Sequence, residues 1–109
     1  MTFAEKVQEL LRLEGAREQL EKKFEVGIGM LEPEQQGRAH SAKSTIVDRM
    51  MERLADTYNE HYPEEVLDAA IAFYGSPIGR KVAQIETEMN QRLSSIVDKA
   101  AEEFGDLLA

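Results

Sequence analysis

Serine and histidine side chains are the residues of this chain that could carry out nucleophilic catalysis. A serine nucleophile needs a base within hydrogen-bonding reach and a third group that orients the base. Only His40 lies within one helical turn of a serine, near Ser41 and Ser44, and no glycine-rich elbow surrounds these residues. We therefore expect that the chain is not an enzyme and has no catalytic residues.

A metal site would have to be built around the second histidine, His61. Its neighbours Glu60, Glu64 and Glu65 carry carboxylates, and imidazole and carboxylate are suitable ligands for zinc or manganese. Glu60 and His61 are adjacent at an expected link between helices, so their side chains should diverge, and no other histidine lies within a helical turn. The chain also has no cysteine, which excludes disulfides and zinc–thiolate sites. We expect no metal and no cofactor.

Ser76, Arg80 and Lys81 form a candidate anion-binding site. They surround an expected helix start, where free backbone amides can hold a phosphate or a carboxylate. Positive side chains at a helix start are otherwise unfavourable, because the helix dipole is positive there, and a bound anion would explain their presence. The structural alternative is that Arg80 or Lys81 is attracted by the last carbonyls of the preceding helix, which should end at the same corner. The residues alone leave both interpretations open.

The elements that position these residues belong to a single domain covering residues 1–109. The chain has 42% hydrophobic and 31% charged residues, and only seven glycines and three prolines are available to interrupt helices.

The net charge of the chain, −8, repels phosphate backbones and anionic lipid, so we do not expect a nucleic-acid partner. Its longest apolar run, residues 69–74, is far too short to cross a bilayer, and we expect no membrane insertion.

Residue spacing predicts an all-α fold, a small bundle of about five helices with a long C-terminal helix. Thr2 and Glu5 match a capping box at the start of the first helix, and Gly15 suits its end. The second helix should fray or kink at the glycines of residues 27–29, and Pro33 suits the first turn of the third helix. No strand pattern and no internal repeat is present.

The fourth and fifth helices should meet at a tight corner. Pro63 opens the fourth helix, and Gly75 is expected to end it in the left-handed conformation. Ser76 should cap the fifth helix and Pro77 should occupy its first position. Gly79, one turn further on, would allow the fourth helix to approach closely. This corner is therefore specified by ordinary helix chemistry.

The fifth helix carries one apolar stripe whose members follow one another at steps of four and three residues: Ile78, Val82, Ile85, Met89, Leu93, Ile96, Ala100, Phe104 and Leu107. Such a helix spans roughly 40 Å between residues 77 and 104, longer than a small domain is wide. Four shorter helices can cover only part of it. We therefore expect a homo-oligomer whose contact includes Met89, Leu93, Ile96, Ala100 and Phe104.

The orientation of this oligomer follows from the charges beside the stripe. Acidic residues there would face each other in a parallel, in-register pair, whereas antiparallel or offset packing avoids this repulsion. The competing arrangement is a monomer in which the first helix folds back over the stripe through Phe3, Val7, Leu10 and Leu11.

Residues 58–65 (YNEHYPEE) and 73–81 (FYGSPIGRK) resemble the bacterial domain of unknown function 2059 family. The signature Phe-Tyr-x-Ser-Pro-x-Gly-x-Lys is matched by Phe73, Tyr74, Ser76, Pro77, Gly79 and Lys81, and Tyr58 and Glu65 match the upstream tyrosine and acidic position. The family-like segment runs from about residue 58 to 98. The resemblance implies an all-helical fold and no established reaction. Family members are commonly exported, which implies a periplasmic location if a leader was removed and a cytoplasmic one for the chain as given.

Two functions from different classes follow from these observations. The first is a non-enzymatic interaction or structural module that self-associates or binds a partner helix through the stripe of the fifth helix. The second is a binding module with an apolar groove, in which Met50, Met51 and Met89 form adaptable walls for a small lipid-like ligand. The length of the fifth helix favours the first.

Overall fold

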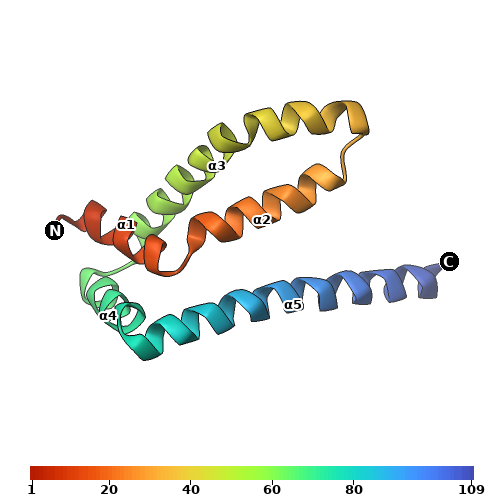
Figure 1. The fold of residues 1–109 in the computed structure, drawn as a ribbon. Coiled ribbons are helices and arrows are strands. Elements are labelled where there is room, and N and C mark those ends of the chain that lie inside the picture. The colour runs from red at the N-terminus through yellow and green to blue at the C-terminus, as the bar shows by residue number, and fades with distance from the viewer.

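The computed structural model describes residues 1–109 as five helices joined by short links, with no strand (Figure 1). They are α1 (Phe3–Leu13), α2 (Ala16–Gly29), α3 (Pro33–His61), α4 (Glu64–Gly75) and α5 (Pro77–Leu108). The predicted all-α fold with a long C-terminal helix is confirmed.

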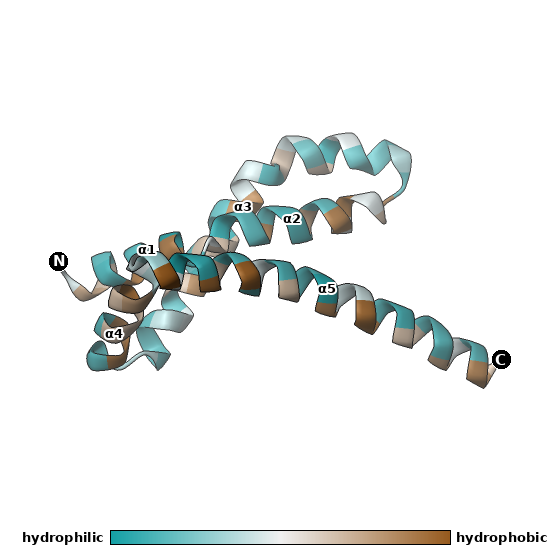
Figure 2. Cartoon of the chain, turned by 60° about the horizontal axis from the view of Figure 1, so that its bottom comes forward, coloured by the Kyte–Doolittle hydropathy of each residue, from teal (hydrophilic) through white to brown (hydrophobic).

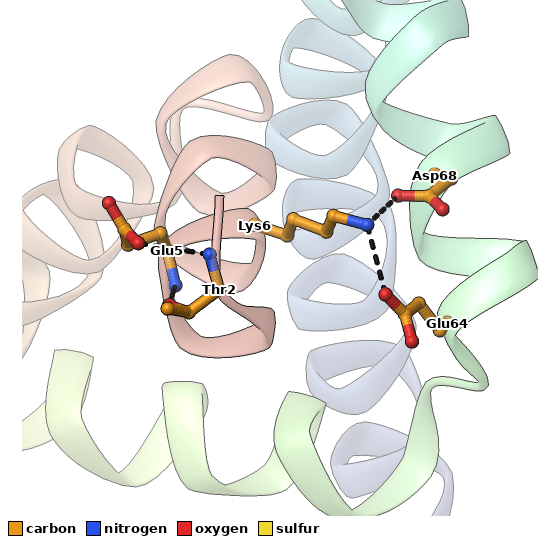
Figure 3. A network of polar contacts seen from close by, with 5 residues as sticks. All are labelled: Thr2, Glu5, Lys6, Glu64 and Asp68. Atoms are coloured by element: carbon orange, nitrogen blue, oxygen red, sulfur yellow. Dashed lines mark hydrogen bonds and ion pairs between the residues drawn. The ribbon is translucent and has the colours of Figure 1, made fainter.

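The N-terminal helix begins and ends as its sequence predicts. The hydroxyl oxygen of Thr2 accepts a hydrogen bond from the backbone amide of Glu5 (3.1 Å), and the Glu5 carboxylate accepts one from the amide of Thr2 (2.9 Å), which completes the capping box (Figure 3). Gly15 separates α1 from α2 with φ 66° and ψ 34°, a left-handed conformation that glycine adopts without steric cost. The chain therefore turns sharply between the first two helices.

The hydrophobic core lies where α1 packs against α3 and α4. Its buried residues come from four helices: Val7, Leu10, Leu11, Ala16, Ala55 and Leu67. An ion-pair network on the surface of this core joins α1 to α4, because the Lys6 Nζ atom lies 3.0 Å from a Glu64 oxygen and 2.7 Å from an Asp68 oxygen (Figure 3). These two carboxylates raise the pKa of the Lys6 ammonium. The buried face of α1 is thus used within its own chain.

Helices α2 and α3 form an antiparallel hairpin that extends away from this core (Figure 1). Ion pairs tie the two helices together: Glu25 to Lys43 at 2.7 Å and Arg17 to Asp48 at 2.8 Å. The glycines of residues 27–29 do not interrupt α2, which stays helical up to Gly29 and then turns towards Pro33, the first residue of α3. The expected kink is therefore not observed, and fraying of the helix at these glycines stays a prediction.

Helix α5 packs chiefly against α4 and then extends as a long arm beside the hairpin (Figure 1). Every residue from Glu88 to Leu108 is exposed. The competing arrangement, in which α1 covers this stripe, is not observed, because Val7, Leu10 and Leu11 are buried in the core with Leu67 of α4.

Candidate interaction surface

The corner between α4 and α5 is held by one serine side chain. The Ser76 hydroxyl accepts a hydrogen bond from the backbone amide of Gly79 (3.1 Å) and donates one to the backbone carbonyl of Phe73. Pro77 occupies the first position of α5. The predicted N-cap and helix start are confirmed, and the direction of the α5 arm is set by these contacts.

Gly75 does not have the left-handed conformation that its type suggested. The only residue with positive φ in the chain is Gly15, and Gly75 is the last residue of α4. The reversal occurs one residue later, where Ser76 is extended (φ −77°, ψ 159°) and caps the next helix. An extended residue between two helices turns the chain without any left-handed residue, so this part of the prediction is wrong.

Gly79 is the residue that the corner requires most strictly. It is buried, and a Cβ atom added to it would lie 1.7 Å from the carbonyl oxygen of Phe73 and 2.8 Å from the Cα atom of Tyr74. These are backbone atoms, which cannot rotate away. The predicted close approach of α4 to this glycine is confirmed, and it explains why the corner has glycine at this position.

The internal bonds of the corner use donors that an anion would need. Pro77 has no amide hydrogen, the amide of Gly79 donates to the Ser76 hydroxyl, and the amide of Arg80 donates to the Ser76 carbonyl (3.0 Å). Arg80 and Lys81 are both exposed. The anion site of Ser76, Arg80 and Lys81 stays a prediction, with fewer free donors than the sequence suggested.

Two tyrosine–glutamate pairs lie near this corner and were not predicted. The Tyr58 hydroxyl on α3 donates a hydrogen bond to Glu14 at the end of α1 (2.8 Å), and the Tyr74 hydroxyl on α4 donates to Glu86 on α5 (3.2 Å). Tyr62 stacks on Tyr58 with ring centroids 4.9 Å apart. No local spacing signals these pairs, because Glu14 and Tyr58 are brought together only by the packing of α1 against α3.

Burial changes the titration of these groups. Partial burial raises the pKa of Glu14, an effect that the hydrogen bond from Tyr58 opposes and the nearby charge of Glu86 reinforces. Burial and the Glu14 carboxylate raise the pKa of Tyr58, and burial and Glu86 raise that of Tyr74. Both tyrosines are therefore hydroxyl donors at neutral pH, and the pairs connect α1 with α3 and α4 with α5.

The apolar stripe of α5 is exposed to solvent over most of its length. Hydropathy colouring shows apolar positions recurring along one side of α5 (Figure 2). Leu93 is 57% exposed, Ile96 64% and Phe104 63%, whereas Leu67 in the core is completely buried. The remaining exposed members are Ile78, Ile85, Met89, Ala100 and Leu107. The residues predicted to form the oligomer contact are thus exposed in the single chain, and their contact with another chain stays a prediction.

The opposite side of α5 faces the hairpin across an open polar groove of about 800 Å³. Its walls are residues of α2, α3 and α5, and Val26 is the one hydrophobic residue among them. Ser94 and Asp98 of α5 line this groove. Ile96 lies two residues from each of them, about 200° around the helix, so the stripe faces away from the chain's own hairpin.

The three methionines expected to share an apolar groove do not line this one. Met51 packs against the hydrophobic core, Met50 is partly buried on α3, and Met89 belongs to the exposed stripe of α5. The three methionines are therefore not gathered as the walls of one groove.

The residues considered for catalysis and metal binding are engaged elsewhere or lie apart. The Ser41 hydroxyl donates to the carbonyl of Gly37 (3.1 Å), and a nitrogen of His40 lies 3.7 Å from a Glu25 oxygen. His61 is exposed at the end of α3. No group of three His, Cys, Asp or Glu side chains is placed to hold a metal ion. None of the five helices combines the length and the apolar character that a membrane span requires.

Comparison with known proteins places the chain in a family. A family model described as "Uncharacterized protein conserved in bacteria (DUF2059)" matches residues 48–106, just over half of the chain. The match includes the C-terminal half of α3, all of α4 and nearly all of α5, and thus the corner and the stripe. No curated protein and no solved structure matches the chain. By this match the chain belongs to the DUF2059 family of bacterial proteins.

Proposed function

We propose that this chain is a non-enzymatic helical interaction module that self-associates through the apolar stripe of α5. The observation that carries the proposal is the exposure of the stripe: from Met89 to Leu107 its members contact none of the other four helices closely enough to be buried. Contiguous apolar surface of this length on a soluble protein usually marks an interaction site.

The stability of α5 itself supports the proposal. Helices longer than a few turns derive most of their stability from packing of an amphipathic face, and isolated helices are marginal in water. The C-terminal part of α5, residues 88–108, has an apolar face and no packing partner within the chain. A second helix laid on the stripe would supply the missing packing.

The remaining features fit an interaction role better than the alternatives. The serine hydroxyls at positions 41 and 76 bond to backbone carbonyls, which suits structural roles. A small lipid-like ligand, the second candidate, has less support because none of the three methionines expected to form its walls lines the groove between α2 and α5.

Light scattering coupled to size-exclusion chromatography at micromolar concentration tests the proposal. We expect a mass of two chains for the native protein and of one chain for Ile96→Glu, because a buried carboxylate in the stripe is strongly unfavourable. The matched control is Ser94→Glu, which adds the same charge two residues away on the groove side and should leave the dimer intact. A native protein with the mass of one chain, or an Ile96→Glu variant that stays dimeric, would overturn the proposal.

A further inference from the structure

We propose that the partner of α5 is the α5 of a second copy, aligned antiparallel about a two-fold axis that passes between Ser94 and Ser95. This inference rests on the proposed self-association and adds the orientation and register of the pair.

The spacing of the stripe residues is the same when counted from either end of the stripe. From Val82 to Leu107 its steps are three, four, four, three, four, four and three residues, a symmetric series centred between Ser94 and Ser95. If the two-fold axis passes through this midpoint, each apolar residue of the stripe lies at the same height along the helix axis as an apolar residue of the antiparallel copy. The pairs are Val82 with Leu107, Ile85 with Phe104, Met89 with Ala100 and Leu93 with Ile96. Val82 is partly covered by its own chain, and the other members are exposed.

The same series repeats every eleven residues, as from Val82 to Leu93 and on to Phe104. An eleven-residue repeat corresponds to about 3.67 residues per turn, so the stripe stays nearly parallel to the helix axis. Two such helices can lie side by side along their whole length without strong supercoiling. The stripe is therefore continuous over the full length of the proposed contact.

The charges on one edge of the stripe are complementary in this register. Lys81, Glu88, Lys99 and Asp106 are exposed and follow one another at steps of seven, eleven and seven residues, which keeps all four within about 20° of one line along the helix. In an antiparallel pair this edge meets the same edge of the second copy. Lys81 then lies beside Asp106 of the second copy, and Glu88 beside its Lys99.

The levels of these charges differ only slightly. The midpoint of the four charges lies one residue from the midpoint of the stripe, so each oppositely charged pair is offset by about 3 Å along the axis, within the reach of long side chains. Each pair occurs twice by symmetry. A parallel pair would instead bring this edge against the opposite edge of the second copy, where Asn90, Val97 and Ala101 carry no charge. The attractions would then be lost, so the charge order favours the antiparallel arrangement.

Charge exchange tests the register. Glu88→Lys alone should raise the dimer dissociation constant about tenfold, because it replaces two attractions by two repulsions. Lys99→Glu alone should do the same, and the double variant should return to within about threefold of the native value. Lys81→Glu and Asp106→Lys form a second exchange with the same expected pattern. Arg80→Glu is the matched control, since Arg80 lies about 100° from Lys81 around the helix, off this edge, and should leave the dimer unchanged.

Spin-label distances test the same geometry independently. The chain has no cysteine, so a single label can be placed at Ser95→Cys or at Gln84→Cys without removing native thiols. In the proposed dimer the two Ser95 sites are nearly level, whereas the two Gln84 sites are separated by about 30 Å along the axis. Electron–electron distance measurement should give a clearly longer distance for the Gln84 labels.

The outcomes separate this inference from the proposed function. A native protein that is monomeric overturns both. A native dimer in which neither exchange restores affinity, or in which the two labels give equal short distances, overturns the antiparallel register and leaves self-association standing. Restored affinity together with the unequal distances supports the register.

Discussion

Apolar residues of the same types are buried in the core around α1, α3 and α4 and exposed along the C-terminal part of α5. Around α1, α3 and α4, leucine and valine side chains are buried against one another, and ion pairs and tyrosine–glutamate bonds close the edges of the core. Along α5 beyond residue 88, leucine, isoleucine and phenylalanine recur at equally regular spacing and are all exposed. Periodic spacing thus indicates that a face will be buried somewhere, but it does not say whether the partner lies in the same chain.

The same leucine-to-alanine substitution should have unequal consequences in the core and in the stripe. Leu67→Ala should lower the free energy of unfolding by about 3–4 kcal/mol, because it removes a completely buried side chain and leaves a cavity. Leu93→Ala, made in the monomeric Ile96→Glu background, should change it by less than about 0.5 kcal/mol. Urea unfolding followed by circular dichroism measures both. Equal losses would mean that Leu93 is packed within its own chain.

The second comparison uses two glycines of α5. Gly79→Ala should lower the free energy of unfolding by about 2–3 kcal/mol, because the added Cβ atom overlaps the backbone of Phe73 and forces α4 and α5 apart. Gly105→Ala is the control, since an added Cβ atom there meets nothing within 4 Å and alanine favours the helix. Its unfolding midpoint in the monomeric background should be unchanged or slightly higher. A stable Gly79→Ala protein would contradict the close approach at the corner.

Local chemistry predicted the helix ends well, and the tertiary contacts poorly. Thr2 with Glu5, Gly15, Pro33 and Ser76 each act on backbone groups within a few residues, so their effects are visible in the sequence. The bonds from Tyr58 to Glu14 and from Lys6 to Asp68 join distant residues, and many exposed acids could have supplied the partner.

The candidate surface was predictable for the same local reason. The stripe of α5 is a property of one helix, and its exposure followed from comparing the length of that helix with the width of a small domain. Gly75 shows the limit of residue preferences: its type favours a left-handed helix end, but the extended Ser76 turns the chain instead. The polar groove could not be predicted, because it depends on how the hairpin and α5 are placed.

A smaller effect is expected for the cap of α5. Ser76→Ala should lower the free energy of unfolding by about 1 kcal/mol, because the amide of Gly79 and the carbonyl of Phe73 both lose their partner. Ser94→Ala removes a hydroxyl that bonds to the Asn90 carbonyl in the exposed part of α5, where alanine is the better helix former. It should not destabilise the monomeric background. If both changes had the same effect, the corner would not belong to the cooperatively folded end of the molecule.

The smallest expected effect is a pH dependence of the melting temperature that is caused by Glu14, at the edge of the hydrophobic core. The pKa of Glu14 is raised above its ordinary value of 4.5 mainly by burial, so the folded state holds a proton there more readily than the unfolded chain does. The cost of ionising Glu14 is therefore absent below about pH 4, appears as the pH rises through the unfolded and then the folded pKa, and persists at neutral pH. Glu14→Gln keeps an oxygen that accepts the Tyr58 hydrogen bond and removes the charge, so its melting temperature should exceed that of the native protein at pH 7 and equal it near pH 3. Glu103→Gln, on the exposed part of α5, is the matched loss of charge and should not show this pH-dependent gain. A Glu14→Gln protein that is less stable than the native one at pH 7 would show that the carboxylate–tyrosine bond outweighs the cost of burial, and that the core end needs this charge.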